Sequence, residues 1–165
     1  MLTRAARWGA ELGQSLAELV LPTVCAGCGD GDQPLRYGTC AHCAATLEGL
    51  VPRPVCPYPP PPGLPWCAAV GDYEGALRDL LLAYKERGRH RLARPLGVLL
   101  AGAVVEAVGA GGPAPVVLVP VPSTAHAVRQ RGGDHLARLT RQAAYRLRSA
   151  GWSVAVARPL RARPR

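Results

Sequence analysis

CAGC at residues 25–28 and CAHC at residues 40–43 are two Cys-x-x-Cys turns, separated by an eleven-residue spacer. Two turns of this kind let four thiolates converge on one tetrahedral ion. A site with four thiolates has no open coordination position, so its role is structural and not catalytic. The pattern predicts a structural zinc ion. The expected ligands are Cys25, Cys28, Cys40 and Cys43.

Two alternatives compete with a zinc site: a pair of disulfides, or cysteines buried as small hydrophobic residues. Disulfides persist in oxidising compartments. Glu11 and Glu18 interrupt the only segment that would serve as the apolar region of a signal peptide. We therefore expect a cytoplasmic protein with reduced cysteines. His42, inside the second turn, is interpreted as a solvated spacer because four thiolates already complete the site.

Composition changes along the chain and predicts four segments. Residues 1–21 carry leucines at helical spacing and predict an amphipathic helix, and residues 22–50 form the zinc module. Residues 51–67 contain four consecutive prolines and predict a stiff, extended linker. A docking site for a proline-binding domain is the alternative for this stretch, and Cys56 and Cys67 are interpreted as free thiols. Residues 68–165 alternate strand and helix patterns and predict an α/β domain.

The α/β pattern of this domain has a defined order. Strands are expected at 68–73, 116–119 and 154–157, and helices at 75–87, 92–108 and 134–150. The run Val116–Val119 is apolar throughout, which is typical of a strand buried on both faces. A strand, a helix and another strand with tight turns predict a parallel pair.

A glycine- and arginine-containing loop joins the strand at 116–119 to the helix at 134–150. In open α/β sheets, ligands bind beyond the carboxyl ends of the strands, and helix N-termini attract anions. We therefore expect this loop to bind phosphate, although a solvated basic loop is the alternative. The candidate residues are Ser123, Arg129, Arg131, Gly132 and Gly133. His126 and His135 are interpreted as surface residues.

The formal net charge of +9 is concentrated at one end of the chain. Residues 129–165 carry ten arginines and one carboxylate, that of Asp134, whereas the preceding residues are nearly neutral. Such an excess predicts a negatively charged partner, either a phosphate, a nucleic acid or an acidic protein surface. The longest apolar run, Leu96–Val105, is too short for a bilayer span and argues against a membrane protein.

Several motifs occur in an order that resembles the ComF/GntX family of phosphoribosyltransferase-like proteins. They are the two Cys-x-x-Cys turns, YEGALR at 73–78, YKERG at 84–88, VPVPS at 119–123 and RQRG at 129–132. The resemblance implies a zinc ribbon followed by a type I phosphoribosyltransferase-like parallel sheet with flanking helices. It also implies an association with DNA uptake in competent bacteria, and contact of the loop from Ser123 to Gly132 with pyrophosphate.

The same resemblance implies an acidic pair and a Thr/Gly-rich loop, which together bind phosphoribosyl diphosphate, and no such signature follows Ala157. We therefore expect a C-terminally truncated member with an incomplete sheet and no transferase activity. Magnesium is expected only in a full-length form. The alternative function is that of a zinc-containing accessory protein that binds nucleic acid through its arginine-rich C-terminal region.

Overall fold

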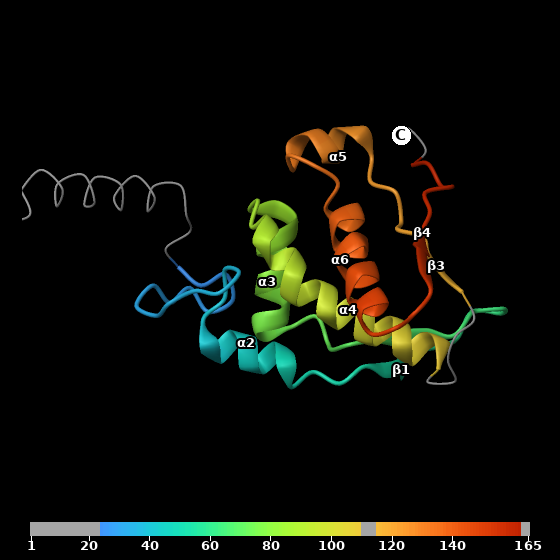
Figure 1. The fold of residues 1–165 in the computed structure, drawn as a ribbon, viewed down its shortest axis with the longest axis horizontal. Helices are drawn as coiled ribbons and strands as arrows, with labels where there is room; N and C mark the ends of the chain where they lie inside the picture. The colour runs from blue at the N-terminus through green and yellow to red at the C-terminus, as the bar shows by residue number, and fades with distance from the viewer. Residues whose placement is uncertain (1–23, 110–114, 163–165) are drawn as a thin grey trace, which may run out of the picture.

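The computed structural model describes residues 24–109 and 115–162, so the helix predicted at 1–21 lies outside the described residues. The α-helices are α2 (Ala41–Glu48), α3 (Gly75–Glu86), α4 (Ala93–Val108), α5 (Ala125–Gln130) and α6 (His135–Ser149). A short 3₁₀ helix, η1 (His90–Leu92), precedes α4. The strands are β1 (Arg53–Val55), β2 (Cys67–Ala69), β3 (Val116–Leu118) and β4 (Val154–Val156). The fold is therefore mixed helix and strand, with the cysteine-rich segment next to α3 (Figure 1).

The described strands form two separate two-stranded sheets. β1 and β2 pair antiparallel, with Val55 opposite Cys67. The proline-rich stretch is thus the loop of a hairpin, whereas we expected an extended linker. β2 also ends at Ala69, earlier than the predicted strand, because the chain bends at residues 70–71 before α3. A Cβ at Gly71 would lie only 3.1 Å from the side chain of Leu77 and 3.3 Å from that of Leu50.

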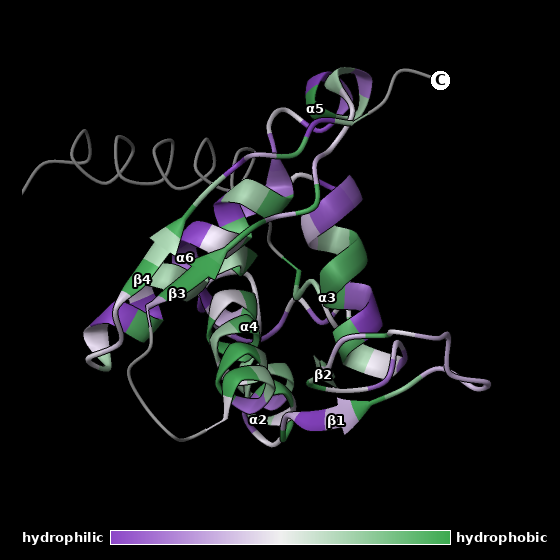
Figure 2. Ribbon diagram, turned by 90° about the vertical axis from the view of Figure 1, so that its right-hand side faces the viewer, coloured by the Kyte–Doolittle hydropathy of each residue, from purple (hydrophilic) through white to green (hydrophobic). Residues whose placement is uncertain are grey.

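β3 and β4 pair in parallel, as the pattern predicted, with α5 and α6 between them in the chain. The expectation that this strand is buried on both faces is wrong, because Val117 is 55% exposed. Val116 and Leu118 pack toward α4 and α6. Val117 faces the other way, where no described helix covers the pair. Figure 2 shows the two strands side by side along α6.

The predicted loop at 120–133 contains a helix, α5, which periodicity did not reveal because it has only six residues. Thr124 caps its first turn by accepting a hydrogen bond from the N–H of Ala127. Asp134 caps α6 in the same manner, accepting from the N–H of Ala137. The helices α3, α4 and α6 begin and end within a few residues of the expected bounds.

The core near the cysteines is continuous with the core between α3 and α4. Ala26 and Leu47 come from the cysteine-rich segment, and both belong to one buried cluster with Leu80, Tyr84 and other residues of α3, η1 and α4. Leu80 is fully buried in this cluster. The cysteine-rich segment therefore shares its apolar contacts with the helices that follow, and we expect its loss to affect them.

Within the described residues, no helix is both long and apolar enough to cross a bilayer.

Candidate metal centre

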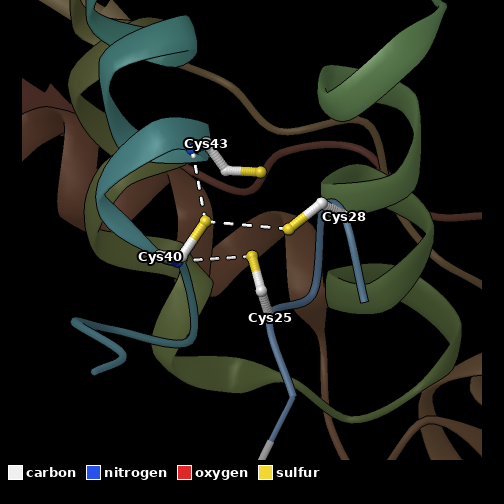
Figure 3. Close-up of side chains that lie close together, drawn as sticks. All are labelled: Cys25, Cys28, Cys40 and Cys43. Atoms are coloured by element: carbon white, nitrogen blue, oxygen red, sulfur yellow. Dashed lines mark hydrogen bonds between the residues drawn. The ribbon is translucent and has the colours of Figure 1, made fainter. Parts of the chain in front are cut away.

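The four predicted ligand cysteines come together in space (Figure 3). All four Sγ atoms lie within 4.8 Å of one another, those of Cys25, Cys28, Cys40 and Cys43. The Sγ atoms of Cys28 and Cys40 are 3.7 Å apart. A tetrahedral ion with metal–sulfur bonds of about 2.3 Å would need sulfurs about 3.8 Å apart. The arrangement is therefore compatible with a structural metal site.

The first Cys-x-x-Cys turn is shaped by two glycines in different ways. The N–H of Gly29 donates to the carbonyl of Cys25 at 2.9 Å, and Gly29 has a φ of +78°, a conformation that favours glycine. Gly27 has no such conformation. A Cβ at Gly27 would instead lie 2.8 Å from the Sγ of Cys43, so this glycine leaves room for a ligand of the other turn.

The second Cys-x-x-Cys turn is the start of helix α2. Cys40 is the N-cap residue, and its Sγ accepts a hydrogen bond from the N–H of Cys43 at 3.5 Å. The N–H of Cys40 in turn donates to the Sγ of Cys25 at 3.3 Å. Backbone donors and the positive end of a helix both favour the thiolate over the thiol. The N–H of Cys40 therefore favours the thiolate form of Cys25, the sulfur that accepts it.

The thiols of the cluster differ strongly in acidity. Burial would raise the pKa of Cys25, but the backbone N–H groups of Cys28, Cys40 and Gly27 lower it to about 6. Burial, followed by the neighbouring sulfurs of Cys25, Cys28 and Cys40, raises the pKa of Cys43 far above its ordinary value. Four thiolates this close repel one another. A bound cation would remove that repulsion and allow all four to ionise.

The remaining cysteines and His42 lie outside the cluster. The thiol of Cys56 donates to the carbonyl of Pro57, and that of Cys67 donates to the carbonyl of Pro65. His42 is exposed, and it is absent from the group of possible metal ligands. Three of the four cluster cysteines are buried, whereas Cys28 is exposed and leaves one side of the site open to solvent.

The residues predicted to bind phosphate lie at both ends of α5. Arg131 forms a bidentate ion pair with Glu86 of α3, with nitrogen–oxygen distances of 3.2 and 3.0 Å. The N–H groups of Gly132 and Gly133 donate to the carbonyls of Arg129 and Val128, which ends α5. Most of the donors expected to hold an anion are thus used within the chain.

The N-terminus of α6 is likewise occupied, because the carboxylate of Asp134 caps it. Ser123 is half-buried at the other end of α5, before its first turn, and Arg129 is exposed. Ser123 therefore lies at one end of α5, and Arg131, Gly132 and Gly133 lie at the other end. Phosphate binding by this loop stays a prediction.

His135 is buried, and the prediction of a surface residue is wrong. Its side chain is 8% exposed and lies edge-on to the ring of Tyr84. Its Nδ1 has no hydrogen-bond partner among the described residues. The hydroxyl of Tyr84 donates to the carbonyl of His135 at 2.6 Å. No local sequence signal reveals this environment, because Tyr84 lies 51 residues earlier in the chain.

Two buried or half-buried histidines predict an acid-sensitive fold. Burial, and then the charge of Arg131, lowers the pKa of His135, and burial followed by Arg138 lowers that of His90. Lys85 also opposes protonation of His135, whereas Asp134 and Glu86 favour it. The unfolded chain therefore binds more protons. Stability is complete above the unfolded pKa of about 6.5 and declines as the pH falls below it.

We expect the melting temperature to fall between pH 6.5 and 5, measured by circular dichroism. His135→Phe keeps the ring and removes both the titration and the unpartnered nitrogen, so it should flatten this decline. His42→Gln, at an exposed position, is the control and should leave the pH profile unchanged. A profile for His135→Phe identical to that of the natural chain would contradict this assignment.

Comparison of the chain with protein-family models, curated proteins and solved structures gave no match.

Proposed function

We propose that the chain is a zinc-stabilised binding protein whose arginine-rich C-terminal region contacts the phosphates of a nucleic acid. One observation carries the second part of this proposal. Residues 115–162 contain eight arginines and a single carboxylate, that of Asp134. Arginine side chains in such excess neutralise nucleic-acid phosphates and release counterions.

Zinc is the metal that four cysteine ligands favour in a closed structural site. The side chains of the described cluster supply soft sulfur donors only, with no carboxylate oxygen of the kind that magnesium or calcium prefers. We assign the ion a stabilising role in a module of the zinc-ribbon type. The ion would hold the segment 24–50 against α3.

Helix α6 offers the most suitable face for a polyanion. Arg141, Tyr145 and Arg148 are exposed and follow one another at intervals of about one helical turn, and Tyr145 is 62% exposed. The Nε of Arg148 also donates to the carbonyl of Val154 at 2.8 Å. The opposite face of α6 is buried against α4 and β4. An aromatic ring between two guanidinium groups can stack on a base while the arginines contact phosphates. This spacing favours single-stranded nucleic acid as the partner.

The proposal predicts salt-dependent binding of a short deoxythymidine oligomer, measured by fluorescence anisotropy. Arg141→Ala should weaken binding and reduce the slope of log K against log salt by about 0.7, the value for one single-strand phosphate contact. Tyr145→Ala should weaken binding without changing the slope. Arg53→Ala, on the hairpin next to Asp72, is the charge-matched control and should change neither. Affinity that is independent of salt would reject the proposal.

A second candidate function is that of a ComF/GntX-type phosphoribosyltransferase-like protein, cytoplasmic and linked to DNA uptake. The parallel pairing of β3 and β4 through α5 and α6 favours it. No transferase activity is assigned to this chain. A parallel NMR titration separates the two candidates: pyrophosphate that shifts the amide signals of residues 123–133, in a chain that binds no oligomer, would favour this candidate over the first.

A further inference from the structure

A tight turn in the cysteine-rich segment places an aromatic residue in an unfavourable backbone conformation. Arg36 and Thr39 close the turn through backbone hydrogen bonds of 2.8 and 3.1 Å. The two central residues, Tyr37 and Gly38, have φ values of 56° and 91°. Turns with positive φ at both central positions favour Asn-Gly, and a tyrosine there is strained. The geometry of the turn therefore does not explain why a tyrosine occupies position 37.

Two guanidinium groups from different parts of the chain lie over the ring of Tyr37. Arg36 is its neighbour in the turn, and the guanidinium carbon is 5.4 Å from the ring centroid. Arg94 comes from the first turn of α4, with a corresponding distance of 4.9 Å. Arg94, and then Arg36, lowers the pKa of Tyr37. The phenol oxygen thus lies in a positive field that stabilises negative charge.

No described carboxylate balances these two guanidinium groups within 4 Å. The ion pairs of the described residues involve other arginines: Arg53, Arg78, Arg131 and Arg158. Helix α4 has no acidic residue in its first turn, and its N-cap residue Leu92 provides no side-chain cap. The positive end of the helix dipole therefore adds to the charge of Arg94 instead of opposing it.

We propose that Arg36, Tyr37 and Arg94 form a binding site for a phosphate group, either free or part of a nucleic-acid backbone. The two guanidinium groups would donate charge-assisted hydrogen bonds to phosphate oxygens. The ring of Tyr37 holds both guanidinium groups in place, and its hydroxyl is a further donor. This site goes beyond the proposed function, which assigns nucleic-acid contacts to α6.

A purely structural explanation would assign the ring only to cation–π contacts that fasten the turn to α4. The two explanations differ for Tyr37→Asn, because asparagine adopts positive φ readily. If the ring serves ligand binding, this variant loses affinity for phosphate while its melting temperature stays the same or rises. If the ring serves stability alone, the melting temperature falls.

The experiment uses the full chain loaded with zinc and follows the Nε–H signals of arginines by NMR. Inorganic phosphate should shift the signals of Arg36 and Arg94 in a saturable manner. Arg94→Ala should weaken phosphate binding about tenfold, the effect expected from losing one charge-assisted pair. Arg91→Ala removes the same charge three residues away and is the matched control, since Arg91 is exposed and is not among the arginines described over the ring of Tyr37.

The outcomes separate the sources of the phosphate group. A shift with inorganic phosphate alone assigns a free phosphate, and an additional shift with a deoxythymidine oligomer assigns a nucleic-acid backbone. Equal losses in Arg91→Ala and Arg94→Ala would indicate general electrostatics and overturn the proposal, as would unshifted Arg36 and Arg94 signals. Failure of the oligomer to bind would refute the proposed function only, because the response to inorganic phosphate does not depend on α6.

Discussion

Replacing Cys40 with serine is expected to release the metal and to unfold more than the cysteine-rich segment. The Sγ of Cys40 is a predicted ligand and lies 3.7 Å from the Sγ of Cys28. The same atom caps helix α2, a role that serine can keep, so the variant tests the loss of the ligand. The N–H of Cys40 also donates to the Sγ of Cys25. Ala26 and Leu47 of the same segment pack with Leu80 in the core. Loss of the cluster would therefore expose part of the surface of α3.

The expected size of this effect follows from metal binding. Structural zinc contributes about 10–16 kcal/mol of apparent binding energy in small modules, whereas whole domains are stable by about 5–15 kcal/mol. Loss of the ion should therefore outweigh the stability that remains. Metal analysis should find one zinc per natural chain and none in Cys40→Ser, and chelation should reproduce the loss of helical circular dichroism.

Cys56→Ser is the matched control, because Cys56 is exposed and bonds only to the neighbouring Pro57 carbonyl. It should retain zinc and the melting temperature of the natural chain. Full zinc occupancy in Cys40→Ser would show that this cysteine is not a ligand. A natural chain purified under reducing conditions without zinc would refute the metal centre as a whole.

The sequence was most informative where short spacing alone determines the structure. Two cysteines three residues apart must share a turn, so the cluster of four was predictable from CAGC and CAHC. Helices α3, α4 and α6 were predictable for a similar reason, since each carries apolar residues at helical spacing over at least twelve residues. Asp134 before α6 was a recognisable cap.

Features that depend on distant partners were not predictable. The apolar run at β3 indicates burial on both faces only if helices cover both faces, and the described helices α4 and α6 cover just one. The hairpin needs Arg53 and Ala69 to meet across the prolines, a pairing that no local pattern encodes. The contact between Tyr37 and Arg94 likewise joins two different elements.

The second large expected effect is a loss of stability when the close packing of α4 on α6 is disturbed. α6 carries the exposed arginines, and both helices pack with the parallel strands β3 and β4 in one apolar cluster. Gly97 lies where the helices approach most closely. A Cβ at this position would lie 2.5 Å from the Cβ of Gln142 and 3.3 Å from the backbone nitrogen of Ala143. Neither atom is the end of a flexible side chain, so α6 itself would have to move away.

Gly97→Ala is therefore expected to destabilise the chain, although alanine is the better helix former by about 1 kcal/mol. Overpacking of a rigid contact costs about 3 kcal/mol or more, which leaves a net loss of about 2 kcal/mol and a melting temperature lower by several degrees.

Gly49→Ala is the matched control, because Gly49 has a φ of −76° and its Cβ would lie no closer than 3.6 Å to other atoms. Denaturant unfolding of both variants measures the difference. A Gly97→Ala chain as stable as the Gly49→Ala chain would mean that α4 and α6 are farther apart in solution, and the arginine face of α6 would then lack its rigid support.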